Sequence, residues 1–370
     1  MPETPVPETP IPETNVLPLP MRIEEITPAW LTAALRTQAP GVTVRDAEIL
    51  DVNHGTCTKI RIRLDLDEAG RRAGIPERVI LKGGFEPHSR RMYHLHEAEV
   101  RGYRDVFPAL GLPSPACYFA DFDPAAQQGV VIMEDLVARG VTFCSLLEPQ
   151  SHAQVARRLT ILARFHAQTW NSPEFEAGRW AWVQPSLPPF QKRMQHYLQP
   201  DVWRSFVTAP RGAAASVRFH DREWAREALD RLVRHAPGQP QVLLHGDTHL
   251  GNLYVDPDGV PGFFDPLPRR GSPMRDIAYH IVCALDTADR RRWEGALLQH
   301  YLDELARNGV DAPSFDAALR EYGAYLAVGY LVWLINESEF QPEAINTACV
   351  ARFSAAMLDH DTLGLLRTIG

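Results

Sequence analysis

The sequence has few cysteines, and no two of them form a Cys-x-x-Cys pair. The five are scattered along the 370 residues, at Cys57, Cys117, Cys144, Cys283 and Cys349. An odd number of scattered cysteines fits neither a disulfide framework nor a cysteine zinc site. We therefore expect the protein to work in a reducing compartment, the cytoplasm.

An excess of basic residues is also missing. The chain has 38 Lys and Arg against 46 Asp and Glu, a formal net charge of -8, whereas nucleic-acid binders are usually basic. Its longest apolar run, residues 325–335, covers only about half of the ~20 residues that a membrane-spanning helix needs. We expect neither a nucleic-acid partner nor a membrane anchor.

Residues 1–21 have little that could be buried. They repeat Pro-Glu-Thr three times and lack the basic start and the apolar stretch of a secretory signal. Proline removes backbone donors, and so few apolar side chains cannot offset the entropy lost on ordering. The sequence predicts a disordered tail here.

The rest of the chain changes from strand patterns to helix patterns near residues 134–140. Apolar residues alternate strictly between positions 59 and 67, which indicates a half-buried strand. Further strands are expected over 78–83 and 129–133, and short ones within 241–265. Helices are expected over 28–37, 93–106, 151–170 and 221–235, and throughout the chain after residue 276. Residues 187–211 allow no clear assignment.

The most informative stretch is LHGDTHLGNLYVDPDGVPGFFD, residues 244–265. It contains Asp247, Asn252 five positions later, and Asp265 at the end of a predicted hairpin. Phosphoryl transfer needs a base that orients the acceptor hydroxyl and oxygen ligands for magnesium. The Asp-to-Asn spacing is that of the kinase catalytic loop, with Gly246 in place of the usual arginine. An ordinary turn is the alternative, because Asp, Asn and Gly favour loops.

HGDTHLGN, from His245 to Asn252, resembles the catalytic loop of the aminoglycoside phosphotransferase and choline kinase superfamily, and the ecdysteroid-kinase-like branch looks closest. Further similar segments follow the family order: HGTCTKIRIRL from His54, ILKGG around Lys82, EVRGY from Glu99, VIMEDL from Val131, LARFHA from Leu162 and RDIAYHI from Arg275. The resemblance implies an α+β, protein-kinase-like bilobal fold. The N-terminal antiparallel sheet lobe would cover 22–135, the hinge 133–137 and the larger, mainly helical C-terminal lobe 138–370.

The resemblance also implies roles for single residues. Asp247 would be the catalytic base, Asn252 and Asp265 would hold Mg²⁺, and Lys82, held by Glu99, would contact the phosphates of ATP. Met133, Glu134 and Leu136 would form the adenine hinge, and Gly55, Thr56 and Thr58 would cover the phosphates. Independently of family, a lysine inside a strand needs an anion, because an unpaired buried charge is costly. Glu97 is the alternative partner of Lys82, since the helix register decides between it and Glu99.

Two features depart from the family pattern. The loop at Gly55 has a single glycine, and Pro266-Leu267-Pro268 follows Asp265 where relatives carry an aromatic and a polar residue. A nucleotide-binding module without turnover is therefore the alternative from another class. His245 and His249 are expected to be structural, since the intervening glycine argues against a helical zinc pair. Asp276 is expected to cap a helix or to brace the catalytic loop.

The acceptor is expected to be a small molecule with a hydroxyl group. Aminoglycosides, choline or homoserine-type substrates are possible, and cationic ones need carboxylates, which Glu337 and Glu339 could supply. An apolar face nearby would instead suit a hydrophobic alcohol, a steroid or an antibiotic-like ring. That face consists of Tyr322, Tyr325, Tyr330, Trp333, Leu334 and Phe340. The alternative for this face is plain core packing.

Overall fold

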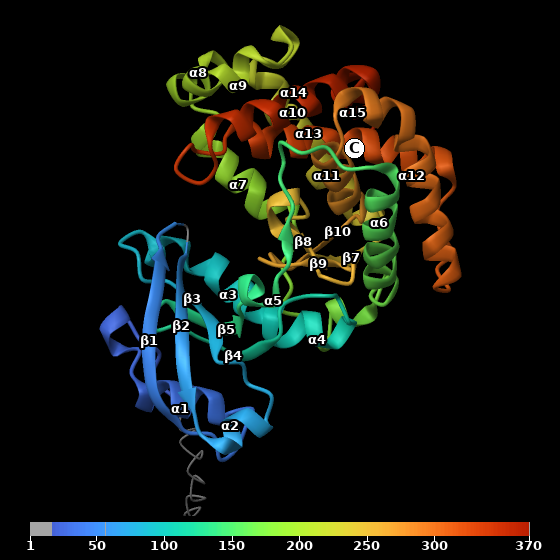
Figure 1. Cartoon of the computed structure of the whole chain (residues 1–370). Coiled ribbons are helices and arrows are strands. Elements are labelled where there is room, and N and C mark those ends of the chain that lie inside the picture. Colours follow the sequence, from blue (N-terminus) through green and yellow to red (C-terminus); the bar gives the residue numbers. More distant parts are fainter. Residues whose placement is uncertain (1–16, 56, 370) are drawn as a thin grey trace, which may run out of the picture.

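A computed structural model describes residues 17–55 and 57–369 and shows two lobes (Figure 1). The N-terminal lobe is built on a five-stranded antiparallel sheet in the order β1-β2-β3-β5-β4. The strands are β1 (Val44–Asn53), β2 (Thr58–Leu66), β3 (Arg78–Gly83), β4 (Cys117–Asp123) and β5 (Gln128–Glu134). The helices of this lobe are α1 (Pro28–Arg36), α2 (Glu68–Arg72), α3 (Tyr93–Arg101) and α4 (Phe107–Leu110). The α+β fold class predicted from the sequence is confirmed.

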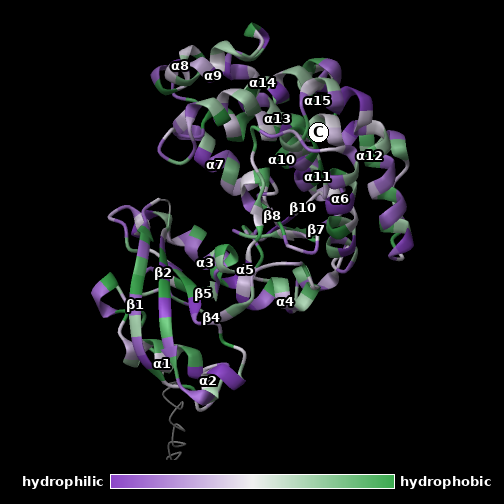
Figure 2. Ribbon diagram, viewed as in Figure 1, coloured by the Kyte–Doolittle hydropathy of each residue, from purple (hydrophilic) through white to green (hydrophobic). Residues whose placement is uncertain are grey.

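Alternation along β2 decides which face of the sheet is buried. Ile60, Ile62 and Leu64 are buried against the α1 side of the lobe, while the residues between them are exposed or half-buried. Figure 2 accordingly shows both hydrophilic and hydrophobic bands along β2. The strand thus closes one hydrophobic core with half of its side chains and leaves the other half for the opposite face.

The end of the predicted tail packs against this sheet. Leu19 is buried in the lobe core, and the Gln128 side chain donates a hydrogen bond to the carbonyl of Pro20, at 2.8 Å. The packed part of the lobe therefore begins before residue 22. Residues 1–16 lie outside the described residues.

The C-terminal lobe is mainly helical. Its helices are α5 (Leu136–Arg139), α6 (His152–Ala167), α7 (Leu187–Tyr197), α8 (Pro200–Thr208), α9 (Pro210–Ala213), α10 (Arg222–His235), α11 (Met274–Ala284), α12 (Thr287–Arg307), α13 (Phe315–Leu334), α14 (Glu343–Asp359) and α15 (Thr362–Thr368). The buried face of α13 packs on α11 and α14, in one core that also reaches Val131 and Met133 of the sheet lobe. No helix among residues 17–55 and 57–369 is both long and apolar enough to cross a membrane.

Two small sheets cross the C-terminal lobe next to the sheet lobe (Figure 1). One pairs β7 (Val242–Leu244) with β10 (Arg269–Gly271), and the other has the order β6-β8-β9. The strands of this second small sheet are β6 (Thr142–Phe143), β8 (Leu253–Val255) and β9 (Pro261–Phe263). These short strands hold the segments between β7 and β10, which carry the residues singled out in the sequence.

Candidate active site

The loop after β7 makes a sharp turn at Gly246. Its φ of +87° lies in the left-handed region, and a Cβ atom there would collide with the carbonyl oxygen of Leu267. Only glycine fits both conditions. The backbone N–H of Leu267 in turn donates to the carbonyl of His245, at 2.8 Å. Gly246, which replaces the kinase arginine, therefore makes room for the unusual Pro266-Leu267-Pro268 segment after Asp265.

Asp276, buried in the first turn of α11, fastens this loop. Its carboxylate accepts the backbone N–H groups of His245, at 2.8 Å, and Gly246, at 3.1 Å. Burial raises the pKa of Asp276, but His166, together with His245 and Arg275, outweighs it, and the pKa is lowered. Burial also lowers the pKa of His245, so this ring is neutral at physiological pH and suits a structural role. Two roles were predicted for Asp276, and these contacts match the one in which it braces the loop.

Asp247 and Asn252 are brought together by the loop. The Asn252 side-chain amide donates to the Asp247 carbonyl, at 3.0 Å, and to Asp247 Oδ2, at 2.9 Å. His249 Nε2 lies 3.4 Å from the same carboxylate oxygen, while His249 Nδ1 accepts the N–H of Gly251. Burial raises and His249 lowers the pKa of Asp247, and the net direction is downward. The Asp247 carboxylate is therefore ionised at neutral pH, and Asn252 keeps its carbonyl oxygen free of these contacts.

Lys82 lies between two carboxylates from different parts of the chain. Its Nζ is 2.5 Å from Glu99 Oε1 on α3 and 2.8 Å from Asp265 Oδ1, and it pairs with Glu99 rather than Glu97. Burial disfavours the ammonium, but Asp265 and Glu99 outweigh it and raise the pKa of Lys82 well above its usual value. The same ion pair, with a contribution from Lys59, holds the pKa of Asp265 far below its usual value despite burial. Lys82 and Asp265 are thus both charged.

The backbone at Asp265 is strained. Its φ of +53° lies in the left-handed region, which a non-glycine residue rarely adopts. Its N–H donates to the hydroxyl of Tyr103, at 3.0 Å. Residues 102–106, where Tyr103 lies, form a π-helical turn, and a Cβ atom on Gly102 would collide with the Pro266 ring. Strained residues of this kind cluster at functional sites.

The predicted phosphate loop and hinge lie beside these residues. Gly55 lines the cleft, whereas the Thr58 hydroxyl is buried and donates to Glu86. Thr56 lies outside the described residues. At the hinge, the N–H of Glu134 donates to the carbonyl of Ala116, at 2.9 Å, and is engaged within the sheet. Leu136 begins α5.

A cleft of about 630 Å³ unites the site, and Lys82, Asp247, Asn252 and Asp265 all line it. An adjoining pocket of about 280 Å³ extends along the hinge and is lined by Met133, Glu134 and Leu136, among others. The residues that the sequence places far apart therefore meet around one space. Among residues 17–55 and 57–369, no group of three or more His, Cys, Asp or Glu side chains could form a metal site.

The model of the phosphotransferase enzyme family matches residues 91–312, more than half of the chain. The chain belongs to this family. It is thus an enzyme, a small-molecule kinase, as predicted from the sequence. The matched region contains Glu99, Asp247, Asn252 and Asp265 but begins after Lys82.

One solved structure supports the fold of this phosphotransferase, and two others are more distantly similar. A protein assigned as an aminoglycoside phosphotransferase in Ralstonia eutropha has 13% identity and a TM-score of 0.52, with 92% of this chain and 98% of that chain covered. The choline kinase LicA from Streptococcus pneumoniae has 14% identity, coverage of 85% and 94%, and a TM-score of 0.48. The amicoumacin kinase hAmiN has 15% identity, coverage of 85% and 88%, and a TM-score of 0.49. No curated protein sequence matches the chain. The similarity to the ecdysteroid-kinase-like branch stays a prediction.

Part of the apolar face considered above lies in the core of the phosphotransferase, and part of it lines the cleft. Four of its residues pack in the core, as the alternative of plain core packing predicted: Tyr322, Tyr325, Tyr330 and Leu334. Trp333 and Phe340 do line the cleft, together with Glu339. Glu337 instead accepts a hydrogen bond from Tyr197, at 3.1 Å.

Sequence reasoning missed several residues of the phosphotransferase cleft. Lys59 reaches Asp265, at 3.7 Å, and Arg193, Arg269 and Arg275 line the cleft. Lys59 could have been noticed, because it begins the alternating strand beside the predicted loop. The arginines have no such signal, since they come from α7, β10 and α11 and meet only through tertiary packing.

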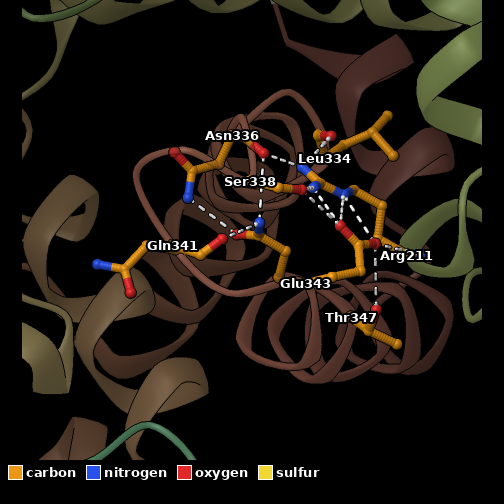
Figure 3. Close-up of polar contacts among 8 residues, drawn as sticks. Arg211, Leu334, Asn336, Ser338, Gln341, Glu343 and Thr347 are labelled. Carbon is orange, nitrogen blue, oxygen red and sulfur yellow. Dashed lines mark hydrogen bonds and ion pairs between the residues drawn. The ribbon is translucent and has the colours of Figure 1, made fainter.

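A buried arginine fastens the segment between α13 and α14, which forms one wall of the cleft. Arg211 of α9 binds the Glu343 carboxylate and donates to the carbonyls of Leu334 and Asn336 and to the Ser338 hydroxyl, the last at 2.9 Å (Figure 3). Only 3% of Arg211 is exposed. The segment therefore has a charged anchor that does not itself line the cleft.

Proposed function

We propose that this phosphotransferase uses ATP and Mg²⁺ to phosphorylate a hydroxyl group of a small molecule, with Asp247 as the base. The observation that carries the proposal is that Lys82, Asp247, Asn252 and Asp265 line one cleft. The nucleotide lies between the lobes and the acceptor lies against Asp247. The protein's place of action is the cytoplasm, and its partner is the acceptor itself.

The chemistry of the donor set fits magnesium. Asp265 offers a carboxylate with 25% of its side chain exposed, and Asn252 offers its amide oxygen, since its nitrogen donates to Asp247. Mg²⁺ prefers such oxygen ligands and takes the remainder from phosphates and water. Bound there, the ion would neutralise charge that develops on the phosphate oxygens.

Lys82 is placed to hold the nucleotide phosphates. In the structure it neutralises Asp265, and its charge is secured by Glu99. A phosphate that enters the cleft would take over one of these contacts, while Glu99 keeps the ammonium in position. Gly55, Thr56 and Thr58 would contribute backbone N–H groups, because the Thr58 side chain is engaged with Glu86.

Asp247 orients the acceptor. One of its oxygens, Oδ2, is held by Asn252 and faces His249, which leaves Oδ1 for the acceptor hydroxyl. The hydroxyl oxygen forms a bond to the γ-phosphorus while the bond to the bridging oxygen breaks, and ADP leaves. The hydroxyl proton passes to Asp247. Catalysis then consists mainly of positioning and charge stabilisation.

Adenine binds in the smaller pocket along the hinge. Met133 and Leu136 supply an apolar lining there. The Glu134 N–H is already donated to Ala116, so the backbone donor for adenine comes from the chain nearer Leu136. All three predicted hinge residues thus surround the adenine ring, but Glu134 cannot also donate its backbone N–H to it.

The decisive experiment compares Asp247→Ala with Asp258→Ala. Asp258 is an exposed aspartate on the turn between β8 and β9, so its replacement is a matched control. ADP release is measured with a panel of sterols, macrolides, aminoglycosides, choline and homoserine, and nucleotide binding by calorimetry. We expect Asp247→Ala to bind ATP almost normally and to lose transfer. Undiminished transfer rules out the assignment, and ATP binding by the unaltered protein without ADP release on any acceptor favours a module without turnover.

A further inference from the structure

We call the part of the cleft that is lined by His94, Arg193 and Arg269 the acceptor side, and it carries unpaired positive charge. Arg193 of α7 and Arg269 of β10 both line it, as does His94 of α3. Among the described residues neither arginine is ion-paired: Arg269 donates to the Pro268 carbonyl, at 2.8 Å, and Arg193 lies over the Tyr197 ring. An arginine beside a cleft without a carboxylate partner is a ready site for an anion.

Two arginines close by in the sequence or on the same helix as His94 do have carboxylate partners. Arg270, the next residue on β10, pairs with Glu176 at 2.6 Å, and Arg101 pairs with Glu97 at 3.0 Å. Glu97 is also the one carboxylate that acts on Arg269 at longer range, and burial still prevails and lowers the pKa of Arg269. The charge of Arg269 is thus not balanced by the protein.

His94 lines the same cleft as the two arginines and senses the charge of both. Its pKa is lowered first by burial and then by the charges of Arg269 and Arg193. His94 therefore stays neutral near pH 7 and adds an uncharged hydrogen-bonding group to the cleft. A third cation, Arg275, lines the same cleft at the Asp247 end, with a buried Nη1 that has no hydrogen-bond partner in the described part of the chain.

Carboxylates are scarce on this side. Of those that line the cleft, Glu99 and Asp265 are bound to Lys82 and Asp247 is the proposed base, which leaves Glu339. A cationic acceptor such as an aminoglycoside would meet more like charge than opposite charge, which costs affinity. The apolar side chains of Phe190, Trp333 and Phe340 line the same space.

We propose that the acceptor is an amphipathic alcohol with an anionic group, and that Arg193 and Arg269 bind this anion while the apolar body lies on Phe190, Trp333 and Phe340. This inference rests on the proposed function and names its substrate class. A carboxylate and a phosphate or sulfate ester share the required charge and geometry. The hydroxyl at the far end of the molecule would then reach Asp247.

The test uses two scaffolds in versions that differ in charge. The first is ω-hydroxydecanoate with its methyl ester, its trimethylammonium analogue and its phosphate analogue; the second is a hydroxylated steroid acid with its methyl ester. Binding is measured by calorimetry with the full-length protein and a non-hydrolysable ATP analogue, and ADP release is measured in parallel. We expect the acids or the phosphate to bind at least about tenfold more tightly than the neutral and cationic versions. Preference for the carboxylate or for the phosphate tells the two anion sources apart.

Variants test the two arginines. Arg193→Met and Arg269→Met should each weaken binding of the anionic probe about tenfold, the size of one charged hydrogen bond, with the KM for ATP unchanged. Arg193→Lys should restore part of the loss. Arg270→Met, on the same strand but paired with Glu176, is the matched control and should leave probe binding unchanged.

The outcomes separate this inference from the proposed function. Equal binding of acid, ester and ammonium versions on both scaffolds overturns the anionic acceptor, whether or not any of them is phosphorylated. An unchanged affinity of Arg193→Met and Arg269→Met for the acid does the same. The proposed function instead fails if Asp247→Ala transfers phosphate normally, which does not depend on the charge of the acceptor.

Discussion

Lys82 Nζ lies 2.8 Å from Asp265 Oδ1, although 183 positions separate the two residues in the chain. The contact joins β3 of the sheet lobe to the segment after β9 in the helical lobe. Glu99 completes the arrangement, so one buried cation serves two carboxylates. This ion pair is therefore both a link between the lobes and the centre of the proposed phosphate site.

Replacing Lys82 with Met should destabilise the protein and abolish transfer. Removal of one partner of a buried ion pair costs roughly 3–5 kcal/mol, because it leaves uncompensated charge. Lys59→Met is the control: Lys59 is 44% exposed and 3.7 Å from Asp265, so its loss should cost about 1 kcal/mol or less. Urea unfolding at pH 7 measures both. Equal free energies of unfolding for the two variants would contradict the central place of Lys82.

Asp276→Asn should weaken the protein in a pH-dependent way. The folded-state pKa of Asp276 is lowered, so its ionised form contributes stability that is present above the ordinary value of 3.8 and is lost as pH falls toward the folded pKa. At pH 7 the substitution should cost about 1.5–3 kcal/mol, the range for a charged hydrogen bond. The difference in the free energy of unfolding between the two proteins should shrink below pH ~4. A difference that stays constant from pH 7 to the acid limit contradicts the brace.

Gly246→Ala should lower the free energy of unfolding by more than the left-handed backbone conformation alone explains. A left-handed residue other than glycine costs roughly 1–2 kcal/mol, and here the added Cβ would also collide with Leu267. Gly74→Ala is a close control, since Gly74 has a φ of +75° and nothing within 4 Å of the added atom. We expect Gly74→Ala to lose only the backbone term and to keep its activity. Gly246→Ala should lose about 100-fold in kcat/KM as Asp247 shifts.

The chemistry of the site was accessible from the sequence because its residues lie in continuous, patterned segments. Alternation predicted β2, a short apolar run predicted β3 with Lys82 inside it, and one loop carries both Asp247 and Asn252. The sequence pattern could not predict that the backbone of Leu267 packs closely against Gly246, since the two residues lie in different turns. Close approach of backbones leaves no periodic signal.

The acceptor side could not be predicted for the same reason. Its residues come from α3, α7, β10 and the segment after α13, and no period connects them. Strand β10 has only three residues, too few for alternation to appear. Helices α8 and α9 both begin at proline, so the run 187–211 contains several short helices rather than one periodic stretch. The tyrosines of α13 fill the core, and the sequence alone could not distinguish them from Trp333 of the same helix, which also lines the cleft.

Arg211→Met should change both stability and acceptor binding. Arg211 is buried, and its guanidinium binds Glu343 and the carbonyls of Leu334 and Asn336, so methionine would leave a carboxylate and two carbonyls without their donor (Figure 3). We expect a loss of about 3–5 kcal/mol in the free energy of unfolding. The segment that bears Glu339 and Phe340 should loosen, so that the KM for the acceptor rises about tenfold while the KM for ATP is kept.

Arg204→Met provides the comparison for Arg211. Arg204 lies on α8 with an exposed side chain, 3.7 Å from Asp201, and such surface pairs contribute about 0–1 kcal/mol. Replacing Arg204 should change neither the KM for the acceptor nor the KM for ATP. The ratio of the two KM values is the informative readout, because general destabilisation reduces the amount of active enzyme and leaves both KM values unchanged. If Arg211→Met lowers stability without raising the KM for the acceptor, the anchor holds the fold but does not position the cleft wall.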